Sequence, residues 1–441
     1  MIILPNALPA PKANSIDSGS LDSSLMTKRA SLTDSTSENF NDLVRYLLKL
    51  EEYLEGLFNY VKKQANCELI DDAGEFMSTC ILGEGIPWSN LVLENSDIKE
   101  VLKKRKPIQW SLAHEIEVIL LVVSLMYTKL GSELTNELIE LQAADEGTDE
   151  KWKQVINYHK KAIASTMFGA KICSITNIES SVNERIFTFM DKISNISIQM
   201  SILSKSSWIN RNSFNSTETF ETNSNGTLSR VSIYVLNELN DCMNLLIDLK
   251  GSLTTKINLN YKDWKDYLSV IQKYITAYAG LFLSIEYYQK DKLGDALGLI
   301  NFSLVSLQSK KLSELKPKQG KILSKFKSKL TLHKNDQYIS NIHSVTTLNV
   351  NKSAFQESSG VILKDLSFLF DLLIQLHLKF SKENDNLKFD TVTDWQDISK
   401  DTKWPLGCKI PVSDIKMYEP ISFRQSTGLL KENYTGRGSY Y

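Results

Sequence analysis

The sequence predicts an all-α protein built from long antiparallel helices. Apolar residues recur at intervals of three and four over several long segments, as they do on the buried face of an amphipathic helix. Runs that alternate apolar and polar residues, which indicate strands, are scarce. With 441 residues, 42% of them hydrophobic, the chain can bury a sizeable core in one long domain or two ordinary ones.

The first predicted helix follows an arm of low helical content. Residues 1–36 are rich in Ser, Pro, Asn and Asp, which indicates a flexible N-terminal arm. The run Ser-Thr-Ser-Glu at 35–38 resembles a capping box, and helical spacing continues from Phe40 to Val61. A second long helix is expected to start near Ser111 and to run past Tyr127.

The remaining helices are predicted on either side of a polar stretch. Residues 150–173 and 182–205 have helical periodicity, and it resumes over 229–256, 262–289, 292–310 and 360–384. Between them, residues 206–228 are rich in Ser, Asn and Thr, which predicts a solvated loop insertion. Residues 424–441 are expected to form a flexible tail.

Two consecutive helices show the spacing of a tetratricopeptide helix pair. Small, aromatic and large residues alternate there so that small side chains permit a close crossing and large ones fill the gaps. The residues in question are Ser284, Tyr287, Ala296, Ile300 and Ser303. A generic helical hairpin can produce a similar pattern, so both interpretations stay open at this point.

No catalytic, cofactor or metal motif is present in the sequence. The chain lacks GxGxxG, GxxxxGK[ST] and GxSxG, and His114 has no second His at the spacing of a zincin site. The five Cys are scattered and no CxxC pair occurs. We therefore expect a protein that is not an enzyme and uses no cofactor.

Charge and hydropathy limit the classes of partner and compartment. The net charge of -1 predicts no general attraction to nucleic acid. The longest apolar run, at 118–127, is about half of what a membrane span needs. No basic region precedes the apolar start of the chain, which argues against a signal peptide. The expected location is cytoplasmic.

A lysine-rich stretch is the one strong charge feature. Residues 310–334 contain nine Lys and a single acidic residue, interleaved with Ile, Leu and Phe. The simple interpretation is a solvated surface, and the functional one is attraction to an acidic partner or an anionic membrane. The candidate basic patch consists of Lys321, Lys325, Lys327 and Lys329.

Several residue patterns follow one another along the helices in a fixed order. Their positions are, in chain order, Trp88, Ser111, Leu112, Glu115, Leu120, Tyr127, Ala162, Ala164, Gln199, Lys205, Ala277, Ala279, Lys292, Gly294, Asp295 and Leu297. In order and spacing these patterns resemble the Bro domain shared by Alix and its fungal relatives. Val122 stands where that family usually has Asn, and Ile196 and Ile198 replace small Ala residues.

The stretch "SKENDNLKFDTV" at 381–392 resembles the end of the family's last long helix. There, Lys, an acidic residue, Asn and Asp precede an extended segment with apolar residues and Val. We expect Asn384 and Asp385 to satisfy freed backbone groups, and Leu387, Phe389 and Val392 to pin the returning chain. The run "CKIPVSDIKMYEPISF" at 408–423 resembles the family's closing segment, so the domain is expected to span 37–423.

The resemblance implies an elongated, boomerang-shaped domain and a non-enzymatic adaptor. It further implies a partner, the C-terminal helix of the main ESCRT-III filament subunit, and peripheral recruitment of a monomer to endosomal or cortical membrane. Among Bro-domain proteins, short stand-alone members act in the fungal ambient-pH signalling pathway, and this chain resembles them most. The alternatives are a general endosomal sorting adaptor and a tetratricopeptide-like scaffold that binds an unrelated peptide.

The resemblance also guides the choice of groove residues. Helix-in-groove recognition needs apolar pockets on one face. The helix near Gln199 is expected to lie beside the helix that follows Gly294. The candidates for the partner groove are Ile196, Met200, Leu304 and Leu307. The simpler interpretation of all four is that they belong to the core.

Overall fold

The computed structural model describes residues 8–33 apart from 14 and 18, 40–93 apart from 90, 109–178, 182–252 apart from 218, 221 and 223, 257–258, 261–307, 360–398 apart from 395 and 396, and 404–424. Every long helix that periodicity predicts occurs in these ranges. The helices are α1 (Ser23–Ala30), α2 (Phe40–Ala65), α3 (Gly74–Thr79), α5 (Leu112–Glu140), α6 (Thr148–Thr176), α7 (Glu184–Thr217), α8 (Asn225–Ser252), α9 (Tyr261–Gln289), α10 (Leu293–Ser306) and α13 (Gly360–Glu383). The all-α prediction is confirmed.

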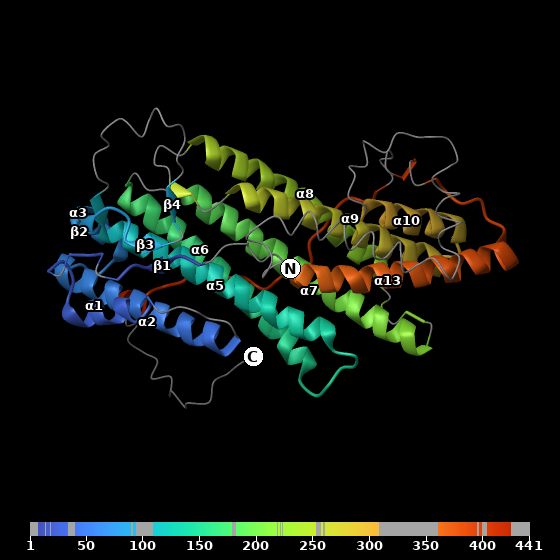
Figure 1. Ribbon diagram of the computed structural model, residues 1–441, viewed down its shortest axis with the longest axis horizontal. Coiled ribbons are helices and arrows are strands. Elements are labelled where there is room, and N and C mark those ends of the chain that lie inside the picture. The colour runs from blue at the N-terminus through green and yellow to red at the C-terminus, as the bar shows by residue number, and fades with distance from the viewer. Residues whose placement is uncertain are drawn as a thin grey trace.

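The long helices pack in chain order into an elongated molecule (Figure 1). Each of α5 to α10 lies against the next one along the chain, α2 covers α5, and α13 lies mainly on α10. α13 also reaches α5, α7 and α9, so it connects the start and the end of this series. Consecutive packing of this kind follows from short connections between antiparallel helices.

Helix α5 is the centre of the core. Every residue from Leu112 to Thr128 is buried, so this helix is covered on all sides. α5 and residues 267–289 of α9 are each long and apolar enough to cross a membrane by composition. However, 89% and 72% of their apolar windows are buried inside the protein, which is the property of core helices.

The N-terminal segment, residues 8–33, is packed against the helices, and the prediction of a flexible arm over 1–36 is wrong for this part. Ile16, Leu21, Leu25 and Leu32 are buried in the main core, and α1 lies on α2. A short strand β1 (Ala10–Pro11) pairs antiparallel with β3 (Trp88–Ser89). The apolar residues of this segment are widely spaced among polar ones. They therefore give no helical or strand period, and the sequence did not predict their burial. The capping-box run at 35–38 lies outside the described residues.

Two more pairs of short strands fasten the connections between helices. β2 (Ile81–Glu84) pairs with β5 (Gln109–Ser111), and β4 (Val92–Leu93) pairs with β6 (Ile257–Asn258). The β2–β5 pair places Ser111 immediately before α5, where its backbone N–H donates to His114 Nδ1 over 3.1 Å. His114 thus helps to satisfy the start of α5, which is a structural role.

The predicted loop insertion at 206–228 is also wrong, because most of it is helical. Residues up to Thr217 belong to α7, and α8 begins at Asn225. Trp208 and Phe214 are buried. The polar composition misled the prediction because some of the amides pair with each other inside the fold: Asn210 Nδ2 donates to Asn225 Oδ1 over 3.2 Å.

The close crossing of α9 and α10 is confirmed. Ser284 Oγ donates to the carbonyl of Ala296 over 2.8 Å, so a side chain of one helix contacts the backbone of the other. A Cβ at Gly280 would lie 2.1 Å from Ser303 Oγ, which shows that only Gly fits at this crossing. Small residues therefore hold these two helices together, as the sequence predicts.

The polar run after α13 locks onto the start of α10. Asn384 bonds both backbone groups of Asp390, donating from Nδ2 over 3.0 Å and accepting at Oδ1 over 2.9 Å. Asp390 Oδ2 in turn accepts the free N–H groups of Leu293 and Gly294 at the start of α10. The prediction is therefore confirmed for Asn384, whereas Asp390, and not Asp385, is the aspartate that satisfies backbone N–H groups, at the start of α10.

The apolar residues of this run do not pin the chain, which corrects the expectation. Leu387, Phe389 and Val392 are 72%, 76% and 42% exposed. The returning chain is held instead by its backbone: Thr393 N donates to Gly294 O over 3.3 Å, and a Cβ on Gly294 would lie 2.2 Å from Thr391 O. Glycine is what permits this close backbone approach.

Candidate functional site

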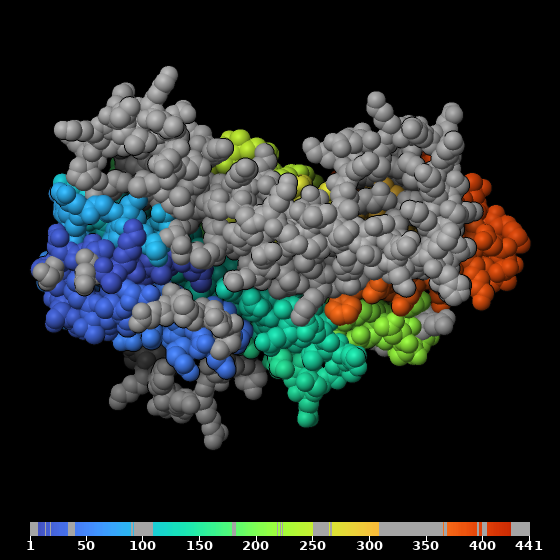
Figure 2. Space-filling view, in the orientation of Figure 1, coloured from blue at the N-terminus to red at the C-terminus, as the bar shows by residue number. Residues whose placement is uncertain are grey.

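A cleft lies between the ends of α5 and α7 and the face of α13. Its volume is about 560 Å³. It is lined by Glu140, Leu141, Gln142, Arg211, Asn212, Asn215, Ser216, Phe368, Asp371, Leu372 and Gln375. Figure 2 shows the end of α7, in green, beside α13, in orange, at the lower right of the molecule. This cleft has two helical walls, which is the shape that accepts a third helix.

Arg211 and Phe368 join the two walls of the cleft. The Arg211 guanidinium lies 3.9 Å from the centroid of the Phe368 ring, and its Nη2 donates to the carbonyl of Ile139 over 2.7 Å. Nearby, Trp208 Nε1 donates to the carbonyl of Leu141 over 2.7 Å. Two side chains of α7 therefore bind carbonyls at the end of α5, which fixes one end of the cleft.

A buried carboxyl group lies one helical turn before Phe368 on α13. Asp365 is buried and accepts hydrogen bonds from the hydroxyls of Tyr274 and Tyr278, and from Ser204 Oγ over 3.5 Å. Burial raises the pKa of Asp365 to about 6, and the nearby Arg211 charge and the Ser204 hydrogen bond only partly oppose this. The residues packed behind the cleft therefore include a carboxyl group, that of Asp365, whose pKa lies near neutral pH.

The four groove candidates chosen from the sequence are core residues. Ile196, Met200, Leu304 and Leu307 are 0%, 1%, 0% and 5% exposed, and all belong to the main core cluster. α7 packs mainly on α6 and α8, whereas α10 packs on α9 and α13, so the expected pairing of α7 with α10 is absent from the main contacts. Periodicity identified an apolar face correctly but not the helices that cover it.

Two residues of the family pattern on α7 have defined partners. Gln199 bonds both backbone groups of Ile410, donating from Nε2 over 3.1 Å and accepting at Oε1 over 2.9 Å. Lys205 forms an ion pair with Asp149 at 2.7 Å. Gln199 thus holds the returning C-terminal segment rather than a separate partner. The candidate basic patch, Lys321 to Lys329, lies outside the described residues.

The α7 residues that line the cleft were missed in the sequence because they fall in the stretch 206–228, which was predicted to be a loop. A signal was present: Trp208, Arg211 and Phe214 are spaced at three residues, which is helical spacing. The Ser and Asn content around them outweighed it.

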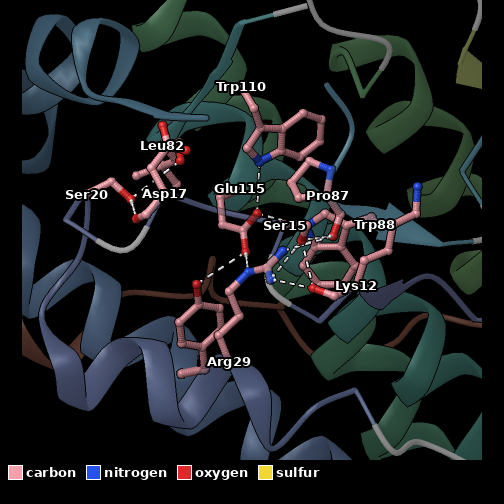
Figure 3. Close-up of polar contacts among 11 residues, drawn as sticks. Lys12, Ser15, Asp17, Ser20, Arg29, Leu82, Pro87, Trp88, Trp110 and Glu115 are labelled. Carbon is pink, nitrogen blue, oxygen red and sulfur yellow. Dashed lines mark hydrogen bonds and ion pairs between the residues drawn. The ribbon is translucent and has the colours of Figure 1, made fainter. Parts of the chain in front are cut away.

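A second polar cluster lies far from the cleft, around the buried carboxylate of Glu115 (Figure 3). Arg29 Nε donates to it over 2.8 Å, and the indole N–H groups of Trp88 and Trp110 donate over 2.8 and 2.9 Å. Tyr53 adds its hydroxyl at 3.2 Å. Arg29 also bonds the carbonyls of Pro87 and Lys12. Every group here is satisfied by protein, so the cluster fastens the N-terminal segment.

Within the described parts of the chain, no group of three or more His, Cys, Asp or Glu side chains is placed to hold a metal ion. The helix-lined cleft between α5, α7 and α13 is the candidate site of this predominantly helical protein.

The comparisons place the chain in one family. Residues 110–441 match the model of the "Family of unknown function (DUF5355)", and the protein belongs to it. No curated protein matches the chain.

Several solved structures are similar in fold at low identity. "Structure basis for endosomal targeting by the Bro1 domain" is 11% identical, with a TM-score of 0.48 over 89% of this chain and 88% of that one. "ALIX BRO1 CHMP4C complex" is 14% identical, with a TM-score of 0.49 over 95% and 96%. "Crystal Structure of ALIX in complex with the SIVmac239 PYKEVTEDL Late Domain" is 13% identical, with a TM-score of 0.47 over 95% and 50%.

Proposed function

We propose that this protein is a non-enzymatic Bro-type adaptor that binds the C-terminal helix of an ESCRT-III filament subunit in the cleft between α7 and α13. The sequence patterns that resemble Bro domains supply the partner class. The observation that carries the proposal is the cleft itself, because its walls are two long helices and its lining includes the apolar side chains of Leu141, directly after α5, and Phe368 of α13.

The chemistry of the cleft suits one amphipathic helix. Phe368 on α13 and Leu141, directly after α5, are partly exposed in the cleft and present apolar surface, whereas Leu372 is only 2% exposed. Arg211 lies on one wall, and the exposed carboxylates of Glu140 and Asp371 also line the cleft. A bound helix that turns an apolar face toward Phe368 and carries charges on both sides matches this arrangement.

The test is binding of a synthetic peptide of the ESCRT-III C-terminal helix to the full chain. Asn215→Trp and Asp371→Arg change exposed cleft residues, so we expect each to weaken binding about tenfold or more while the thermal midpoint stays unchanged. Asn59→Trp on the exposed face of α2 is the matched control and keeps wild-type affinity. Wild-type affinity in both cleft variants would remove the cleft from the proposal, and no binding by the wild type would remove the partner.

We further propose that the protein acts as PalC does, in the fungal ambient-pH pathway, as a recruiter linking ESCRT-III at an endosomal or cortical membrane to proteolytic activation of a pH-responsive transcription factor. The support is the resemblance to short Bro-domain proteins together with the Ser- and Asn-rich composition. In a fungal strain that lacks its PalC-type protein, the chain is expected to restore pH-dependent cleavage of that factor. Restored sorting of endosomal cargo without restored cleavage supports the general sorting adaptor instead.

A further inference from the structure

Most of the side chains that line the cleft between α7 and α13 are polar, and four of them are neutral amides. Asn212 and Asn215 lie three residues apart on α7, Gln375 lies on α13, and Gln142 follows the end of α5. None of the four forms a hydrogen bond with the residues that the structure describes. Because amides lie on both walls, the cleft has unused hydrogen-bonding capacity on both sides.

Asn212 is the most unusual of these amides. It is half-buried, and its Nδ2 is shielded from solvent without an acceptor among the described residues. The adjacent Arg211, by contrast, donates to the carbonyl of Ile139 over 2.7 Å. A shielded donor without an acceptor costs free energy, so a bound group that supplies an acceptor is favoured. The last torsion of an Asn side chain is soft, and a rotation about it turns Nδ2 toward the cleft.

The protein itself shows what an amide side chain on one of its helices binds. Gln199, also on α7, donates from Nε2 to the carbonyl of Ile410 and accepts from its N–H at Oε1. Asn384 bonds both backbone groups of Asp390 in the same way. Ile410 and Asp390 both lie outside helices and strands, where main-chain groups are free. One amide satisfies both groups because it carries a donor and an acceptor.

The middle of a bound helix offers nothing to such amides. Within a helix every N–H and C=O is bonded along the helix itself, and only the groups of the terminal turns are free. An extended stretch leaves both main-chain groups of each residue available. The amides of the cleft therefore match an extended main chain better than the middle of a helix.

The apolar part and the amide part of the cleft follow one another along its walls. α7 and α13 run in the same direction here (Figure 1), because contacts between them occur in the same order along both helices. Asn215 lies about one turn after Arg211, and Gln375 about two turns after Phe368. A helix packed on Phe368 at one end can thus continue as an extended stretch between Asn215 and Gln375 at the other.

We infer that this amide part binds the main chain of an extended stretch that adjoins the partner helix, with Asn212, Asn215 and Gln375 bonding its N–H and C=O groups. The inference rests on the proposed function, because the helix brings the stretch to the cleft. It deepens that function by naming what the cleft recognises there, a backbone whose side chains matter little. Since the amides are neutral, salt screens this part of the recognition little.

The first test uses the full chain and a synthetic peptide that contains the ESCRT-III C-terminal helix with its flanking residues. N215L/Q375M keeps the approximate size of two exposed side chains and removes their hydrogen bonds, so we expect about tenfold weaker binding at an unchanged thermal midpoint. The loss should be the same at about 0.1 M and about 0.5 M salt. N59L/Q64M makes the same changes on the exposed face of α2 and should keep wild-type affinity.

Asn212→Leu separates binding from a structural role. Because the variant removes a shielded donor without an acceptor, its thermal midpoint should stay or rise while the peptide binds more weakly. A lowered midpoint with unchanged affinity would assign Asn212 to the fold and overturn its role in binding.

The second test uses peptides that carry a single N-methyl group on the main chain, at successive positions beside the helix. The methyl group removes one N–H and leaves every side chain in place. In the extended stretch it should weaken binding to the wild type about tenfold, and it should weaken binding to N215L/Q375M much less, because the bond is already lost there. Equal losses in both proteins at every position would overturn the inference.

The outcomes separate this inference from the proposed function. If Asn215→Trp blocks binding but N215L/Q375M binds like the wild type, the helix occupies the cleft and the inference is wrong. If Asn215→Trp also keeps wild-type affinity, or if the wild type does not bind the peptide, the proposed function fails and the inference fails with it.

Discussion

Two buried carboxyl groups, one in each half of the molecule, are stabilised in different ways. Glu115 at the start of α5 receives the Arg29 guanidinium and three neutral donors. Asp365 on α13 receives only hydroxyl groups, and no ion pair of Asp365 occurs among the described residues. The difference teaches that burial alone does not decide how a carboxyl group behaves. The first carboxyl group has a directly bonded cation that offsets part of the cost of burying it, whereas the second has only neutral donors, and burial raises its pKa.

The two clusters also join different elements of the fold. The Glu115 cluster joins the N-terminal segment to α2 and α5 through a network in which every donor has an acceptor. The Asp365 cluster joins α7, α9 and α13 behind the proposed partner cleft. We therefore expect the stability of the second half to depend on pH through Asp365.

The largest expected effect comes from breaking the ion pair. Arg29→Ala leaves the Glu115 carboxylate buried without a cation, which is expected to cost about 3–5 kcal/mol. Equilibrium unfolding in denaturant measures it. Arg29→Ala combined with Glu115→Gln should recover part of the loss, since no buried charge remains. Lys153→Ala breaks the exposed pair with Glu150 and should leave the midpoint unchanged. An equally small effect for Arg29→Ala would show that the cluster does not fasten the segment.

The second effect concerns pH at Asp365. Because its pKa in the folded protein is raised to about 6 from 3.8, the folded protein binds a proton more tightly than the unfolded chain between these values. Stability from this group is therefore complete below about pH 4 and is lost as pH rises, on the order of 3 kcal/mol by about pH 7.

Asp365→Asn removes this slope. The difference in the free energy of unfolding between wild type and variant, measured from about pH 4 to about pH 7, should change by roughly that amount in favour of the variant. A difference that stays constant over this range would show that folding does not raise the pKa of Asp365.

The third effect has the opposite sign and extends the comparison to a buried base. His159 on α6 is fully buried, and neither of its ring nitrogens has a hydrogen-bond partner among the described residues. Burial lowers the pKa of His159 from 6.5 to about 3. Its contribution is therefore complete above pH 6.5 and is lost as pH falls, by about 2 kcal/mol at about pH 5.

His159→Phe keeps the ring and removes the titration. In the acidic range the variant should lose less stability than the wild type, measured in the Asp365→Asn background so that the opposing slope is absent. Parallel curves for the two proteins would mean that His159 takes up a proton without penalty in the fold.

Periodicity predicted all of the long helices because a helix must bury one face. The spacing of apolar residues within the segment itself is enough to show this. It could not predict the Glu115 cluster, since Arg29 and Glu115 are 86 residues apart. The groove candidates failed for the same reason. An apolar helix face such as that of Leu304 predicts that another part of the protein or a partner covers it, but it does not predict which one. The polar lock at Asn384 was predicted because local backbone groups required it. The exposure of Leu387 and Phe389 was not, because nothing local demands it.

The smallest expected effect comes from removing a neutral amide that bonds the backbone. Gln199 bonds both backbone groups of Ile410 and so fastens the returning segment to α7. Gln199→Ala removes two neutral hydrogen bonds, each of which contributes about 1 kcal/mol, and Ile410 is near enough to the surface for water to replace part of them. We therefore expect a loss of about 1 kcal/mol in global stability.

The local consequence of Gln199→Ala should be larger than the global one. The segment 404–424 is held at separate points, including Cys408 N to Arg230 O at 3.1 Å and Tyr418 N to Ala164 O at 3.1 Å. Removal of one point should raise hydrogen exchange around Ile410 while exchange in α5 stays unchanged, because the other points remain. Lys160→Ala, which removes the exposed bond to Ser413, is the matched control and should change exchange less. If exchange rises equally along the whole segment, the contacts act as one cooperative unit, and the contrast with the single Glu115 cluster disappears.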